Sequence, residues 1–263
     1  MYVHGWLSER QFRNIRREQR DNCWCGGRLL PFEWHASYGV CTECGCYVNR
    51  RPPAPEELEH LYSFPLYWHT RQKLKGYPTI ERRPANDRAD GRVDYWLDLI
   101  RRYAPHTGQV VEIGCAHGLL LAELKRLGYE CVGVEVDERT AIWARDNMEV
   151  DVRAGLFPGV ELPSCDLFLA FDVIEHYPSP HKFLQEAAQL LVRGGTVIIQ
   201  TPIEYRSDRP PFAEMHTNVF DDLEHLYVFT RKSIDHLAMV SGLSVVSEHE
   251  WRLAHEIVVF RHR

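Results

Sequence analysis

The stretch VVEIGCAHG, residues 110–118, places a carboxylate in an apolar run directly before a glycine loop. A dinucleotide loop needs the glycine pattern G-x-G-x-x-G, but only Gly114 and Gly118 are present here, with Ala116 between them. The Glu112 carboxylate would also repel a pyrophosphate at a helix N-terminus, whereas it would attract an ammonium or sulfonium group. We therefore expect this loop to bind a ligand that carries positive charge.

A second carboxylate, Glu135, follows 21 residues after Gly114, at the end of the next predicted strand. In doubly wound folds an acidic residue at this place accepts the two ribose hydroxyls of a nucleoside. An adenosine joined to a cationic amino acid satisfies both carboxylates. The sequence thus predicts S-adenosylmethionine as the cofactor.

Cysteines are crowded near the N-terminus, where CWCGG and CTECG form two pairs separated by 15 residues. This spacing is close to that of a zinc ribbon, in which four thiolates surround the metal at about 2.3 Å. We expect structural zinc bound by Cys23, Cys25, Cys41 and Cys44. Cys46 is a spare thiol, so the choice of four stays open, and the alternative is a set of reduced structural cysteines.

From Gly91 onward, apolar runs of strand length alternate with segments of helical periodicity, which favours a parallel sheet covered on both faces. We expect an α/β fold with a doubly wound, mostly parallel, seven-stranded Rossmann-like sheet. Two final strands without a helix between them, 244–250 and 255–262, should form an antiparallel hairpin at one edge. The other predicted elements are strands at 109–113, 131–135, 165–171 and 195–201, and helices at 92–104, 117–128, 139–148 and 181–191.

The chain should divide into two units with separate cores. Residues 1–85 are expected to form the zinc-ribbon-like unit and a connector, and residues 86–263 the cofactor-binding domain. Within the first unit, residues 7–20 suggest a short basic helix, and Pro55 suggests the start of a helix in the connector.

Four segments resemble successive motifs of class I S-adenosylmethionine-dependent methyltransferases, over roughly residues 91–263. They are VVEIGCAHG, VGVEVD, CDLFLAFDVIEHYPSPHKFLQEAAQLLVRGGTVIIQTP and EHLYVFTRKSIDHLAMVSGLSVV. The EH after the fourth strand is similar to that of ubiquinone-biosynthesis and related small-molecule methyltransferases. The cysteine unit followed by PAPEELEHLYS resembles the front end of sugar C-methyltransferases, whose further C-terminal domain has no counterpart in this sequence.

The resemblance implies specific contacts to the cofactor. Glu112 lies near the charged end, Glu135 holds the ribose and Val136 flanks the adenine. The backbone of Phe171 faces the methionine part. The loop around the methionine part is expected to consist of Gly114, Cys115, Ala116 and Gly118. Beside the adenine, where the family often has an acidic residue, this sequence has Gly155 and Leu156. The backbone and the Phe157 ring are the expected substitute contacts there.

Methyl transfer also requires a group that takes the proton of the acceptor. The candidate bases are His176 in DVIEHYP and the pair Glu224 and His225 in DDLEHLYVFT, because both motifs follow sheet elements that should open onto the site. For each histidine the alternative is a packing role in a loop. Tyr67 and His69 in LYWHT are further candidates that could reach the site from the connector.

Composition limits the partners. The net charge of −6 argues against a nucleic-acid surface, and no apolar run is long enough for a membrane span or signal peptide, so we expect a cytoplasmic protein. The acceptor is expected to be a small hydroxylated or carbohydrate-like metabolite. One alternative is an enzyme that modifies RNA or protein and holds it with the zinc unit and the basic run from Arg10 to Arg20; another is a binding module without catalysis. The oligomeric state stays open.

Overall fold

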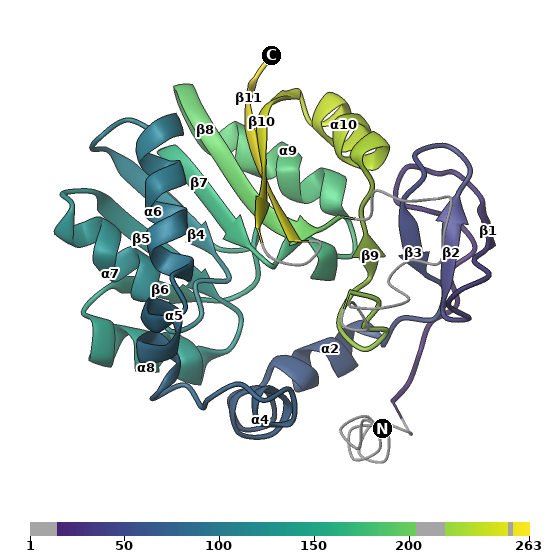
Figure 1. Ribbon diagram of the computed structural model, residues 1–263, viewed down its shortest axis with the longest axis horizontal. Coiled ribbons are helices and arrows are strands. Elements are labelled where there is room, and N and C mark those ends of the chain that lie inside the picture. Colours follow the sequence, from purple (N-terminus) through teal and green to yellow (C-terminus); the bar gives the residue numbers. More distant parts are fainter. Residues whose placement is uncertain (1–14, 204–218, 252–254) are drawn as a thin grey trace.

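The computed structural model of the protein describes residues 15–203, 219–251 and 255–263 (Figure 1). Within these ranges the main sheet has the order β10-β11-β8-β7-β4-β5-β6. The pairs β8–β7, β7–β4, β4–β5 and β5–β6 are parallel, whereas β11 is antiparallel to both β8 and β10. The predicted seven-stranded sheet with an antiparallel edge hairpin is confirmed. Its strands are β4 (Gln109–Ile113), β5 (Glu130–Glu135), β6 (Asp151–Ala154), β7 (Cys165–Phe171), β8 (Leu191–Pro202), β10 (Leu243–Trp251) and β11 (His255–His262).

Helices cover both faces of this sheet because its strands are apolar on both sides. In β7, Leu167 and Leu169 belong to the core under one set of helices, while Phe168 and Ala170 belong to the core under the other. The first face is covered by α6 (Arg92–Tyr103) and α7 (Leu119–Arg126), and the second by α9 (Pro180–Leu190) and α10 (Arg231–Val240). Helix α8 (Glu138–Met148) packs beside α7 on β5 and β6.

The order of the strands reverses beside β4. The chain proceeds from β4 outward to β5 and β6, and then returns to place β7 on the other side of β4. In open α/β sheets, ligands bind at such a reversal, beyond the carboxyl ends of the strands. Gly114 and Asp172, which directly follow β4 and β7, therefore mark the expected position of a site.

A small antiparallel sheet contains the cysteine-rich segment. It is formed by β1 (Leu29–Pro31), β2 (Tyr38–Cys41) and β3 (Tyr47–Asn49), and its fourth strand, β9 (Tyr227–Val228), comes from the C-terminal part of the chain. Figure 1 shows β9 descending from the main sheet to lie beside β3. One backbone segment thus belongs to the small sheet and leads directly into α10.

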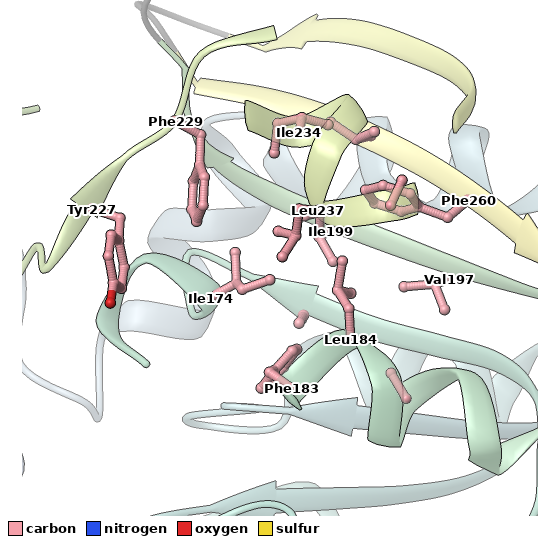
Figure 2. Packing of buried hydrophobic residues seen from close by; sticks show 14 of the residues in the cluster. Ile174, Phe183, Leu184, Val197, Ile199, Tyr227, Phe229, Ile234, Leu237 and Phe260 are labelled. Atoms are coloured by element: carbon pink, nitrogen blue, oxygen red, sulfur yellow. The ribbon is translucent and has the colours of Figure 1, made fainter. Parts of the chain in front are cut away.

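The expectation of two separate cores is wrong. A single cluster of buried side chains runs from Cys44 and Val48 in the small unit to Phe183 and Ile234 on the helices of the main sheet. Figure 2 shows part of this core, with Phe229 between the helices and the end of β9. Because β9 completes the small sheet, the apolar residues around it pack against both parts of the chain.

The connector between the two sheets is helical. It contains α2 (Pro55–Tyr62), α3 (Phe64–Leu66), a π-helical turn η1 (Tyr67–Arg71), α4 (Gln72–Leu74) and α5 (Arg83–Ala89). The predicted helix start at Pro55 is confirmed, with the proline in the first turn, where its missing N–H costs no hydrogen bond. None of the helices in the described ranges is long and apolar enough to cross a membrane.

The predicted basic helix over residues 7–20 is not found where it can be assessed. Residues 1–14 lie outside the described residues, and residues 15–20 are not helical. Arg17 forms a β-bridge with Pro53, and the backbone N–H of Arg20 donates to the carbonyl of Arg50 at 2.8 Å. Pairing with this neighbouring segment replaces the hydrogen bonds that a helix would make.

Candidate active site

A pocket opens at the carboxyl ends of the central strands, where the strand order reverses. The loops after β4, β5, β6 and β7 form one side of it, and the helical connector forms the other. Most residues that the sequence suggested for the cofactor line this pocket: Gly114, Ala116, Glu135, Val136, Gly155 and Leu156.

The loop after β4 requires an unusual backbone. Gly114 has a φ of +69°, and a Cβ atom there would lie 2.6 Å from Cγ2 of Val173, so only glycine fits. Ala116, at the place where a glycine was missing from the pattern, also has a positive φ of +49°, at a cost of about 1–2 kcal/mol for an alanine. Its backbone N–H donates to Oε2 of Glu135 at 3.0 Å, which holds the loop against the end of β5.

Glu135 presents a carboxylate to the pocket. Besides the contact with Ala116, its Oε1 accepts a hydrogen bond from the backbone N–H of Asp137 at 3.3 Å. Each oxygen keeps a further lone pair for donors from a ligand. Burial raises the pKa of Glu135 to about 7, so its charge changes near neutral pH.

Some residues suggested for the cofactor lie behind the pocket wall: Glu112, Cys115, Gly118 and Phe171. Glu112 is buried on β4, and within the described part of the chain its Oε2 has no hydrogen-bond partner. Burial, followed by the nearby charge of Glu135, raises the pKa of Glu112 to about 8. The Phe157 ring packs against Phe168 in the core and is not available as a contact for the adenine. The Phe171 ring stacks on Trp96 with ring centroids 4.3 Å apart, and the expected contact of its backbone with the cofactor stays a prediction.

The connector supplies a wall that the sequence largely did not reveal: Pro55, Leu58, Tyr62, Tyr67 and Trp68. Among these, only Tyr67 was anticipated, and its suggested companion His69 instead packs against Phe64. The hydroxyl of Tyr62 is buried and lacks a partner in the described residues. The available signal was the density of aromatic residues in LYSFPLYWHT, residues 61–70.

The two candidate histidines are neighbours with ring centroids 5.1 Å apart, but only His176 lines the pocket. Nδ1 of His176 lies 2.8 Å from the carbonyl oxygen of Glu224, and Nδ1 of His225 lies 2.7 Å from that of Val219. Because a carbonyl only accepts, both Nδ1 atoms carry hydrogen and both Nε2 atoms carry lone pairs in the neutral rings. Burial lowers the pKa of His176, and that of His225 to about 4.

The structure places Glu224 in an ion-pair network away from the pocket lining. Its Oε2 lies 2.8 Å from Nζ of Lys75, its Oε1 pairs with the buried guanidinium of Arg71, and Asp221 contacts both cations. Despite burial, these cations hold the pKa of Glu224 well below its usual range. A carboxylate engaged in this way is a poor proton acceptor, which argues against the expected role of Glu224 as a base.

The four cysteines expected to bind metal are brought together. Their sulfur atoms all lie within 4.8 Å of one another, with Cys23 3.7 Å from Cys44 and Cys25 3.4 Å from Cys41. Each pair lies at a tight turn followed by a glycine with positive φ, Gly26 and Gly45. The buried Cys46 is not part of this group.

A doubly wound sheet with a glycine loop after β4 and a carboxylate after β5 is the arrangement of class I S-adenosylmethionine-dependent methyltransferases. The family model described as a methyltransferase domain matches residues 86–248, more than half of the chain. The chain therefore belongs to this methyltransferase family, with the class I fold.

Individual proteins resemble parts of the chain. A ubiquinone biosynthesis O-methyltransferase of Maricaulis maris is 29% identical over 170 residues, which cover 59% of this chain and 64% of that protein. The chain thus spans less than two thirds of this relative. A putative O-methyltransferase structure from Nostoc punctiforme has a TM-score of 0.55 at 19% identity, covering 65% of this chain and 55% of that chain. An S-adenosylmethionine-dependent methyltransferase structure from Mesorhizobium loti has a TM-score of 0.53 at 15% identity, covering 66% of this chain and 99% of that chain. Both structures share the fold of this chain over the aligned part.

The ion-pair network predicts a large effect of Glu224→Ala on stability. The substitution removes the shortest partner of Arg71, which is 4% exposed, and should lower the free energy of unfolding by about 3 kcal/mol. Urea denaturation measures this. Asp98→Asn, which breaks an exposed pair with Arg101, is the control and should cost at most about 0.5 kcal/mol. Equal costs for the two variants would contradict the role given to the network.

Proposed function

We propose that the protein is an S-adenosylmethionine-dependent methyltransferase that methylates a small hydroxylated or carbohydrate-like metabolite. The main support is that Glu135 and His176 line one pocket. The carboxylate proposed to bind the ribose of the cofactor and an imidazole that can accept a proton from a hydroxyl therefore face the same space. Family membership and the O-methyltransferase name of the Maricaulis relative favour an oxygen atom as the acceptor.

The residues present fit the cofactor. Gly114 and Ala116 of the loop after β4 line the pocket, and the Glu135 oxygens keep lone pairs for two ribose hydroxyls. Val136 and Leu156 supply apolar surface at the pocket edge for the adenine. When bound, S-adenosylmethionine supplies a methyl group already activated by its sulfonium, so the protein contributes mainly by positioning the acceptor.

We place the acceptor between His176 and the aromatic wall of the connector. Tyr62 lines the pocket beside the His176 ring, with ring centroids 5.7 Å apart. The aromatic faces of Tyr67 and Trp68 suit the apolar side of a ring. In this arrangement His176 is the catalytic residue that contacts the acceptor hydroxyl, and Glu224 and His225 hold its imidazole in place.

An RNA or protein substrate is less well supported. The basic residues that the structure describes near the N-terminus make contacts within the chain: Arg16 with Glu56, Arg17 with Asp222, and Arg20 with the hydroxyl of Tyr227. Phosphate binding would require several free Lys or Arg side chains, in a chain whose net charge is −6.

We also propose a structural zinc ion at Cys23, Cys25, Cys41 and Cys44. Four thiolates at about 2.3 Å from zinc in a tetrahedron lie about 3.8 Å from one another, close to the two sulfur distances above. None of the cysteines, all of which lie in the described residues, forms a disulfide, which supports a reducing, cytoplasmic location. The zinc would stabilise the turns that carry β1 to β3.

Cofactor affinity should depend on the ionisation of Glu135. Ribose hydroxyls donate to the carboxylate, so binding of S-adenosylhomocysteine should be strongest above about pH 8 and weaken as the pH falls through the pKa of about 7. Below about pH 6 the loss should approach 10-fold per pH unit. Calorimetric titrations from pH 5.5 to 8.5 measure this effect.

Two variants complete this test. Glu135→Gln should weaken binding by about 10-fold or more at pH 8 and flatten the dependence below pH 7. Glu123→Gln, on the exposed side of α7, should behave like the original protein. An unchanged pH profile in Glu135→Gln would show that another group controls binding.

The acceptor and the role of His176 can be tested together. In a panel of nucleotide sugars and hydroxylated metabolites, radiolabelled methyl transfer is expected to a small molecule and not to bulk RNA. His176→Ala should lower kcat about 100-fold and leave the Kd of S-adenosylhomocysteine within about 3-fold, as for a group that acts in the transition state. The exposed His262 provides the control, His262→Ala, with unchanged kcat. Efficient labelling of RNA would favour the macromolecular alternative.

The zinc proposal predicts one zinc ion per chain that survives gel filtration in dilute EDTA. Elemental analysis should find this zinc lost in Cys41→Ser and retained in Cys46→Ser, since Cys46 is a buried thiol outside the group. Because the core is continuous, Cys41→Ser should lower Tm in a single transition. Zinc loss in Cys46→Ser but not in Cys41→Ser would change the assigned ligands.

A further inference from the structure

A second cluster of potential metal ligands lies beside the pocket, apart from the four cysteines. It contains Glu175, His176 and His225, and one donor atom of each lies within 4.8 Å of those of the other two. Glu175 and His176 are neighbours in the 3₁₀ turn η2 (Ile174–His176), and Nε2 of His176 lies 3.8 Å from Oε1 of Glu175. The backbone N–H of Leu226 donates to the carbonyl of Glu175 at 2.9 Å, so the third ligand is held beside the first two.

Both imidazoles are oriented as in metal-binding histidines. A histidine that binds metal through one nitrogen usually donates its other N–H to a carbonyl or carboxylate, which fixes the ring and the tautomer. Here Nδ1 of His176 donates to the carbonyl of Glu224, and Nδ1 of His225 donates to that of Val219. The two Nε2 lone pairs are the atoms left to bind a ligand.

The negative charge of the buried Glu175 carboxylate is not balanced by a cation among the described residues. Its side chain is 0% exposed, and Oε2 accepts a hydrogen bond from the hydroxyl of Thr201 at 2.9 Å. Among residues 15–203, 219–251 and 255–263, no group donates a hydrogen bond to Oε1, and no Lys or Arg lies within ion-pair distance of it. The connector cations Arg71 and Lys75 pair with Glu224 and Asp221. An unpaired buried carboxylate oxygen is costly unless a cation or donor satisfies it.

We propose that Glu175, His176 and His225 bind one divalent transition-metal ion, such as Mn²⁺ or Fe²⁺, at the wall of the pocket. Two imidazoles and one carboxylate with open positions form a ligand set that such ions favour over Mg²⁺ or Ca²⁺, which prefer oxygen ligands. Since His176 lines the pocket, the open positions of the ion face the space where an acceptor would lie.

The role of this ion rests on the proposed function. If the acceptor is a hydroxyl compound, the ion binds its oxygen and lowers the pKa of the hydroxyl, whose proton passes to water. The oxygen then forms a bond to the methyl carbon as the bond from that carbon to sulfur breaks, with the electron pair staying on sulfur. With the ion bound, the contact between the ion and the acceptor oxygen replaces the direct contact between His176 and the hydroxyl that is proposed above.

Binding of Mn²⁺ tests the site directly, because its electron paramagnetic resonance signal in water disappears when the ion binds. Full-length protein, loaded with zinc and freed of excess metal, is titrated with Mn²⁺ alone. We expect one Mn²⁺ per chain with a micromolar Kd, and spin-echo modulation from directly bound imidazole nitrogen. Glu175→Gln keeps the side-chain shape and the contact with Thr201, and it should weaken binding roughly 10-fold or more. His225→Ala should weaken binding similarly and reduce the nitrogen modulation.

The controls separate this proposal from the methyltransferase assignment. Glu123→Gln should leave Mn²⁺ affinity unchanged, and S-adenosylhomocysteine affinity should stay within about 3-fold in Glu175→Gln if that variant is folded by circular dichroism. Absence of Mn²⁺ binding below millimolar concentration, or binding that Glu175→Gln and His225→Ala leave unchanged, would overturn the metal site alone. Mn²⁺ binding without any S-adenosylhomocysteine binding would overturn the methyltransferase assignment and leave the metal site standing.

Discussion

The segment from Asp221 to Phe229 is the constraint on which the rest of this structure depends. Its carboxylates neutralise two cations of the connector, its backbone continues the small sheet through β9, and its Glu224 carbonyl orients the imidazole of His176. The hydroxyl of Tyr38 in the cysteine-rich unit donates to the carbonyl of His225 at 2.8 Å, in the same segment. The small sheet, the connector and the pocket are therefore positioned by one short stretch of chain.

This arrangement explains why a charged network lies so deep in the protein. Buried ion pairs add little net stability compared with apolar packing, because desolvation offsets their attraction. They do discriminate between arrangements, since a displaced connector would leave Arg71 and Glu224 buried without each other. The network thus specifies where the aromatic wall of the connector lies relative to His176.

The pocket combines two kinds of surface with different origins in the chain. The loops after β4 and β5 belong to the part matched by the methyltransferase domain model, and they line the side of the pocket proposed for the cofactor. The part of the connector that lines the pocket, from Pro55 to Trp68, lies before residue 86, outside that match, and forms the side proposed for the acceptor. The two sides of the pocket thus come from different segments, the strand loops of the α/β fold and the separate connector.

The sequence alone predicted what depends on local patterns. Six strands of the main sheet follow from apolar runs, whereas the short β6 has no such run and was not placed. The loop from Gly114 to Gly118 follows from its residue types, and the grouping of the four cysteines from spacing and turn glycines, because each needs only neighbours in the chain. The aromatic wall, the paired state of Glu224 and the approach of Glu175 to His225 join residues about 50 to 150 positions apart. Such contacts leave no periodic trace in the sequence, so the shared core and the ionic environment of the histidines were decided only by the tertiary structure.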